Sequence, residues 1–96
     1  MDVLLIVEAV GLSNKDVFDE HLSKEGFLEI EGEENAYEGK ATSHLLNTRT
    51  YILEVVSKGL KKSGFDECKI IFQVGENPME AFKFSKKSND FLSVEV

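Results

Sequence analysis

A continuous run of apolar residues near the start of the chain constrains the fold most. Val3 to Val7 are all apolar, and Gly11 closes the segment. A short apolar run that ends at a turn residue is typical of a β-strand covered on both faces, rather than one with a face in water. The sequence therefore predicts a central first strand, and a domain built around a sheet.

A first helix is expected directly after this strand. Ser13 is the predicted N-cap, Asp16 lies near the positive end of the helix, and Leu12 is placed to pack on Val17. Gly26 is the predicted stop.

The longest helical pattern runs from Ser43 to Lys62. Its apolar residues recur at helical spacing and form one stripe, made of Leu45, Ile52, Val56 and Leu60. Lys61 and Lys62 lie near the negative end of the helix and Gly64 follows, which is a typical helix end.

The remaining segments favour strands, with one ambiguity. Residues 27–31 and 36–41 are expected to form a hairpin with an acidic tip, residues 68–74 alternate as a strand, and residues 91–96 form a last short strand. Asn77, Pro78 and Glu80 have the spacing of a helix start, so residues 78–87 are predicted as a short helix. The alternative is a strand, because Ala81 to Phe84 also alternate.

This order of elements predicts an α+β fold. A β-α-β-β-α-β order is that of a ferredoxin-like split β-α-β sandwich, here with a short C-terminal helix or hairpin and an added strand. With 96 residues, the chain is expected to form one domain over residues 1–96. Such a fold hosts many functions and identifies none of them.

Charge and cysteine content narrow the classes of function. The net charge is −7, and residues 1–40 carry 11 Asp and Glu against three Lys, whereas residues 41–96 are nearly balanced. Such an acidic field disfavours non-specific binding to nucleic acid, which depends on Lys and Arg. The single cysteine, Cys68, fits a reducing compartment, and no membrane or targeting segment is expected, so the predicted location is the cytoplasm.

Arg49 is the only arginine, and helical spacing places it in the middle of the apolar stripe. It is expected either to reach the edge and pair with Asp2 or Glu25, or to belong to an anion site. The split β-α-β topology would gather it at one end of the sheet with Asp2, both histidines and several hydroxyls. The candidate anion-binding residues there are Ser43, His44, Asn47, Thr48 and Arg49. The alternative is that these polar residues only cap the helix.

An acidic patch is the second candidate site. Its members are Glu29, Glu31, Glu33, Glu34 and Glu38. Their spacing does not match a calcium-binding loop, so no metal site is predicted. The patch is interpreted either as a solvated hairpin or as a docking surface for a basic protein partner.

The expected function is therefore that of a small acidic protein-interaction or regulatory module. Apolar residues such as Leu4, Ile6, Ile71 and Phe72 cannot all be covered by helices on one sheet face, so a homodimer is predicted. No cofactor and no catalytic set are predicted, and Cys68 is expected to be a packed thiol. The alternative is a protein that binds phosphate ligands or cleaves RNA phosphodiesters with the Arg49 and His44 end.

Overall fold

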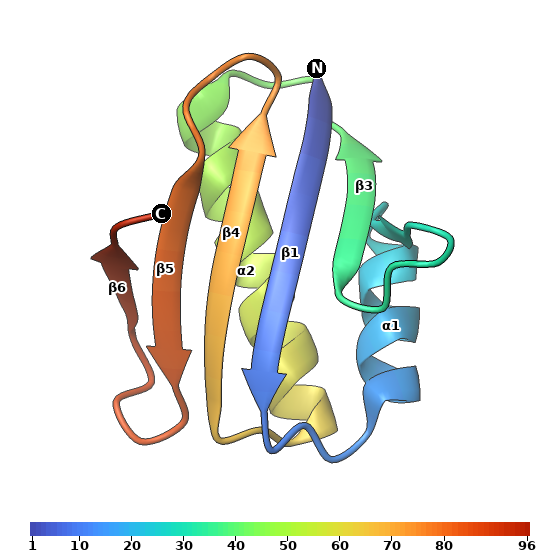
Figure 1. The fold of residues 1–96 in the computed structure, drawn as a ribbon, viewed down its shortest axis with the longest axis vertical. Helices are drawn as coiled ribbons and strands as arrows, with labels where there is room; N and C mark the ends of the chain where they lie inside the picture. Colours follow the sequence, from blue (N-terminus) through green and yellow to red (C-terminus); the bar gives the residue numbers. More distant parts are fainter.

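The computed structural model describes residues 1–96 as an α+β fold with one six-stranded antiparallel sheet and two helices (Figure 1). Both helices lie on the same face of the sheet. The strand order is β2-β3-β1-β4-β5-β6. The elements are β1 (Asp2–Val10), α1 (Lys15–Lys24), β2 (Leu28–Glu29), β3 (Ala36–Lys40), α2 (Leu45–Ser63), β4 (Glu67–Val74), β5 (Glu80–Ser85) and β6 (Phe91–Val94).

The first strand occupies the middle of the sheet, between β3 and β4. Because side chains alternate along a strand, Val3, Leu5 and Val7 point toward the helices and are buried. Leu4 and Ile6 point the other way and are only half-buried. The prediction that this strand is covered on both faces is therefore correct for one face only. The helices cover that face, and the other face of the sheet is open.

The two helices begin slightly later than predicted. The N-cap of α1 is Asn14, whose side chain accepts a hydrogen bond from the Val17 amide at 3.2 Å. Ser13, the predicted cap, instead donates its backbone N–H to Gly64 and ties the start of α1 to the end of α2. Helix α2 begins at Leu45 after His44 and buries one stripe of its surface, including Ile52, Val55, Val56 and Leu60.

The predicted helix over residues 78–87 is wrong, and the strand alternative is confirmed. Residues 80–85 form β5, which pairs with β4 on one side and with β6 on the other. Its aromatic residues pack in stacks: the Phe82 ring lies 5.9 Å from Phe72, and the Phe84 ring lies 4.3 Å from Phe91. Backbone pairing on both edges and aromatic packing outweigh the local helix-start signal of residues 77–80.

Neither helix has the combination of length and apolar composition that crossing a membrane requires.

Candidate interaction surface

The open face of the sheet carries a continuous row of apolar side chains. In the β-sheet register, Ala36 lies opposite Ile6, Ile6 opposite Ile71, Ile71 opposite Ala81, and Ala81 opposite Val94. Directly opposite residues in neighbouring strands point to the same face, so these five form one row across β3, β1, β4, β5 and β6. No helix covers this row.

A second row, made mostly of charged side chains, runs parallel to the apolar row and lies two residues further along the strands. Glu8 lies opposite Lys69, Lys69 opposite Lys83, and Lys83 opposite Leu92, which is 62% exposed. None of these three charged side chains forms an ion pair within the chain, although Glu8 and Lys69 are direct neighbours. Lys40 and Asp2, on the same face, do pair with each other.

Two hollows interrupt the open face. One, of about 460 Å³, lies over the charged row and is lined by residues that include Glu8, Lys69, Lys83 and Leu92. The other, of about 630 Å³, lies over β1 and β3 and is lined by residues that include Leu4, Leu28 and Glu38. Both combine apolar and charged side chains, which suits contact with another protein surface.

The structure separates the five glutamates of the predicted acidic patch. Glu31, Glu33 and Glu34 remain together as exposed residues of the loop between β2 and β3. Glu29 and Glu38 do not join them, because they point to opposite faces of the sheet. Glu29 lies opposite Tyr37 on the helix-covered face, and Glu38 lies opposite Leu28 on the open face. An exposed acidic loop is ordinary in a solvated hairpin, so this loop is a weaker candidate surface than the open face.

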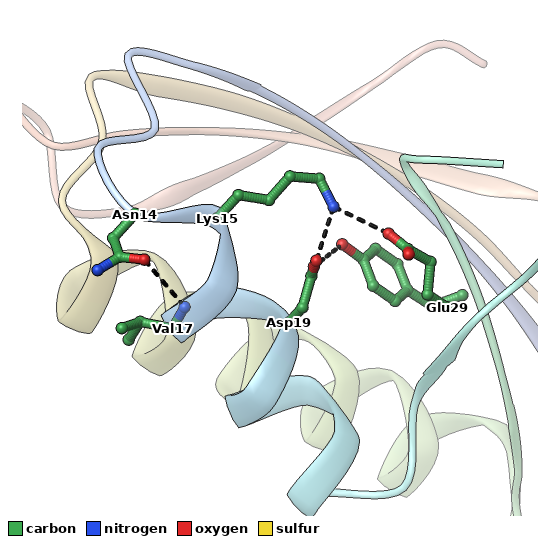
Figure 2. Close-up of polar contacts among 6 residues, drawn as sticks. Asn14, Lys15, Val17, Asp19 and Glu29 are labelled. Carbon is green, nitrogen blue, oxygen red and sulfur yellow. Dashed lines mark hydrogen bonds and ion pairs between the residues drawn. The ribbon is translucent and has the colours of Figure 1, made fainter.

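Glu29 belongs to an ion-pair network that holds α1 against the hairpin, and Figure 2 shows its contacts. Lys15 lies 2.7 Å from Asp19 and 2.8 Å from Glu29, and the Tyr37 hydroxyl donates to Asp19 at 2.5 Å. Burial and the hydrogen bond to Asp19 raise the pKa of Tyr37, so its hydroxyl stays protonated and remains a donor. The network is a structural tie between α1 and β3.

The candidate anion-binding residues do not converge on one site. Ser43, Asn47 and Thr48 line a hollow of about 340 Å³, but neither His44 nor Arg49 lines it. His44 is the exposed N-cap of α2, and its side chain forms no capping hydrogen bond. The buried Thr48 hydroxyl donates to the Ser43 carbonyl oxygen, so it acts within the helix start.

Arg49 has a partner that the sequence analysis missed. Its Nε lies 2.7 Å from Oε1 of Glu80 on β5, close enough for an ion pair although the N–H is not aligned as a hydrogen bond. The predicted pairing with Asp2 or Glu25 is wrong, because Asp2 pairs with Lys40 and Glu25 accepts from Tyr51. Because residues 78–87 are predicted as a helix, nothing in the sequence places Glu80 beside α2.

His21 also lies away from the predicted cluster. It is buried between the helices, where its ring contacts Gly59, and its Nδ1 is 3.3 Å from Lys62 Nζ. A Cβ at Gly59 would lie 3.1 Å from both His21 and Phe18, so this glycine permits the close approach of α1 and α2. His21 therefore contacts the C-terminal half of α2 and not its start.

Cys68 is buried on the helix-covered side of β4. Burial raises the pKa of its thiol to about 12, and the nearby Glu8 carboxylate acts in the same direction. At neutral pH the thiol is protonated and packed, which does not suit a nucleophile. No group of three or more His, Cys, Asp or Glu side chains converges on a point that could hold a metal ion.

The fold and these surfaces define an α+β protein with one covered and one open sheet face. Comparison with protein-family models, with curated proteins and with solved structures finds no match.

The Arg49–Glu80 ion pair leads to a stability prediction. Both side chains are mostly buried, at 30% and 23% exposed, so Arg49→Met leaves a carboxylate with reduced solvation and no cation. We expect a loss of about 1–3 kcal/mol, between the values typical of exposed and of buried pairs. Urea unfolding of Arg49→Met, Glu80→Gln and the double variant measures it. Lys58→Met, which breaks an exposed pair with Glu54, is the matched control and should lose less. A loss that the added Glu80→Gln does not relieve would contradict the role of the pair.

Proposed function

We propose that this protein is a small acidic protein-interaction module that acts as a homodimer through the open face of its sheet. The observation that carries the proposal is the apolar row of Ala36, Ile6, Ile71, Ala81 and Val94, over which no helix lies. Ala81 is buried among its neighbours, and the other four side chains are half-buried. An antiparallel sheet with one solvated face normally carries polar side chains on that face. An apolar row in that position favours burial against another sheet.

A second copy of the chain is the occupant that best matches this face. A two-fold symmetric contact uses the same patch on both copies, so an apolar row that is central to one face is opposed by an equal row. The ends of the face add further exposed apolar side chains, Leu28 on β2 and Leu92 on β6. Two such faces would pack about 10 Å apart, as in other sheet sandwiches.

The chemistry of the rest of the chain supports binding rather than catalysis. The single thiol is buried and protonated, and Arg49 is already paired with Glu80. The one cysteine, buried and without a disulfide, supports a cytoplasmic location. We further propose a ferredoxin-like core of β1 to β4 with α1 and α2, to which β5 and β6 are added at one edge; the neighbour order β2-β3-β1-β4 supports it.

The test is the oligomeric state. At micromolar concentration the wild-type chain is expected to sediment at twice its mass of 10.8 kDa, and Ile71→Lys is expected to sediment as a monomer, because it places a charge in the apolar row. Leu92→Lys changes a side chain that is already exposed and is a second variant with little cost to folding.

Leu46→Lys is the matched control, since Leu46 is 61% exposed on α2 and does not lie on the sheet. It should remain dimeric. Circular dichroism and a thermal melt confirm that each variant is folded. A wild-type chain that sediments as a monomer at every micromolar concentration would refute the homodimer.

A further inference from the structure

The charged row on the open face restricts how two copies can meet. Glu8, Lys69 and Lys83 lie beside the apolar row, so a second sheet that covers this row also comes close to these charges. Each of the three lacks an ion-pair partner within the chain. Burying such charges without opposite charges facing them would oppose association strongly.

We propose that the two copies are related by a two-fold axis that runs parallel to the strands, between β1 and β4, so that Glu8 of each copy pairs with Lys69 of the other. This inference rests on the proposed homodimer. In this arrangement β1 of each copy faces β4 of the other, and the Glu8–Lys69 ion pairs determine the register.

The β-sheet register supplies the geometric step. Ile6 and Glu8 of β1 lie opposite Ile71 and Lys69 of β4. The axis is parallel to these strands and lies above the gap between them. A rotation of 180° about it places β1 of one copy over β4 of the other and does not shift the strands along their length. Ile6 of one copy then meets Ile71 of the other, and Glu8 meets Lys69, so both the apolar and the charged rows are complementary.

The same rotation places Lys83 of β5 against the β3 side of the second copy. At the level of Lys83, that side is the loop that leads into Ala36, the first residue of β3. This loop carries the exposed Glu33 and Glu34. Lys83 of one copy therefore lies against this acidic loop of the other, which is charge complementarity of the kind found in specific interfaces.

Other positions of the axis bring the wrong groups together. An axis across the strands at the level of Glu8 places Glu8 on Glu8 and Lys69 on Lys69. An axis across the strands at the level of Ile6 places Glu8 on Leu4 and Lys69 on Gln73. Both charged side chains then face uncharged residues. An axis parallel to the strands between β4 and β5 places Lys69 on Lys83. Each of these leaves charges opposed or buried alone.

Charge exchange between two variants tests the inference. Glu8→Lys and Lys69→Glu alone each place like charges in both symmetric contacts, and we expect each to raise the dimer dissociation constant at least about tenfold. An equimolar mixture of the two variants restores opposite charges at both contacts. The mixture should therefore form a heterodimer that native mass spectrometry detects, with an affinity within a few-fold of wild type. The double variant Glu8→Lys with Lys69→Glu should dimerise with itself.

Glu54→Lys on α2 is the matched control for Glu8→Lys, because it makes the same change in net charge at an exposed site on the helical side and should leave the dimer unchanged. Recovery of affinity in the mixture supports the axis. A wild-type dimer whose variants show no recovery in the mixture, or no weakening alone, overturns the axis and leaves the homodimer standing. A monomeric wild type overturns both.

Discussion

Phe72→Ala is expected to destabilise the fold by about 3–5 kcal/mol, the range for removal of a large buried aromatic side chain. Phe72 is fully buried on the helix-covered side of β4, and its ring is nearly parallel to that of Phe82 at 5.9 Å. Truncation removes this stack and opens a cavity in the centre of the core. Because a domain of this size has a total stability of only about 5–15 kcal/mol, the variant should unfold at a much lower urea concentration.

Phe82→Ala is the matched control for this prediction. Phe82 takes part in the same stack but is only half-buried, so its truncation leaves a smaller void and should cost less. Both variants are compared with wild type by urea unfolding at one protein concentration, since association stabilises the folded state. An equal or smaller loss for Phe72→Ala would contradict the core assignment.

Cys68 is expected to make the fold sensitive to alkaline pH. Its thiol has an ordinary pKa of 9.0 and a folded pKa raised to about 12 by burial, so the unfolded chain loses this proton first. The stabilising contribution is fully present below about pH 9 and is lost as the pH rises toward the folded value. At about pH 11 the loss from this one group should reach about 2–3 kcal/mol.

Cys68→Ala isolates this contribution. At neutral pH the variant should be less stable than wild type by about 1 kcal/mol, because a small buried group is removed. At about pH 11 this difference should vanish or reverse, since the variant has no thiol to titrate. Urea unfolding at a series of pH values measures both curves. If the free energy of unfolding falls in parallel for the two proteins as the pH rises, the Cys68 thiol does not cause the loss of stability at alkaline pH.

Much of the fold follows from local patterns in the sequence. The apolar run of residues 3–7 and the alternation of residues 68–74 predict two strands, and the stripe through Ile52, Val56 and Leu60 predicts the long helix. These predictions are confirmed because a strand and a helix bury one face at periods that the sequence displays directly. The helix predicted at residues 78–87 fails because its capping signal is local, whereas β5 depends on pairing with β4 and β6.

The candidate sites were less accessible to sequence analysis. The sequence shows that Ile71 and Lys69 alternate with buried residues, but not that Ile6 and Glu8 lie opposite them. The sequence indicates that Arg49 needs a partner, but Glu80 lies beside it only because residues 80–85 form β5. The sequence predicts His21 and His44 at the same end of the sheet, whereas in the structure His21 lies beside Gly59 and His44 lies at the start of α2.

By itself, the sequence determined the α+β class, most of the element order, the long amphipathic helix and the surplus of apolar strand residues on a chain of net charge −7. Only the tertiary structure decided the strand neighbours, the partner of Arg49 and the joining of Ile6, Ile71 and Ala81 into one row beside Glu8 and Lys69. The physical reason is that periodicity along the chain determines which face a residue occupies, whereas register between strands distant in sequence depends on how the whole core packs.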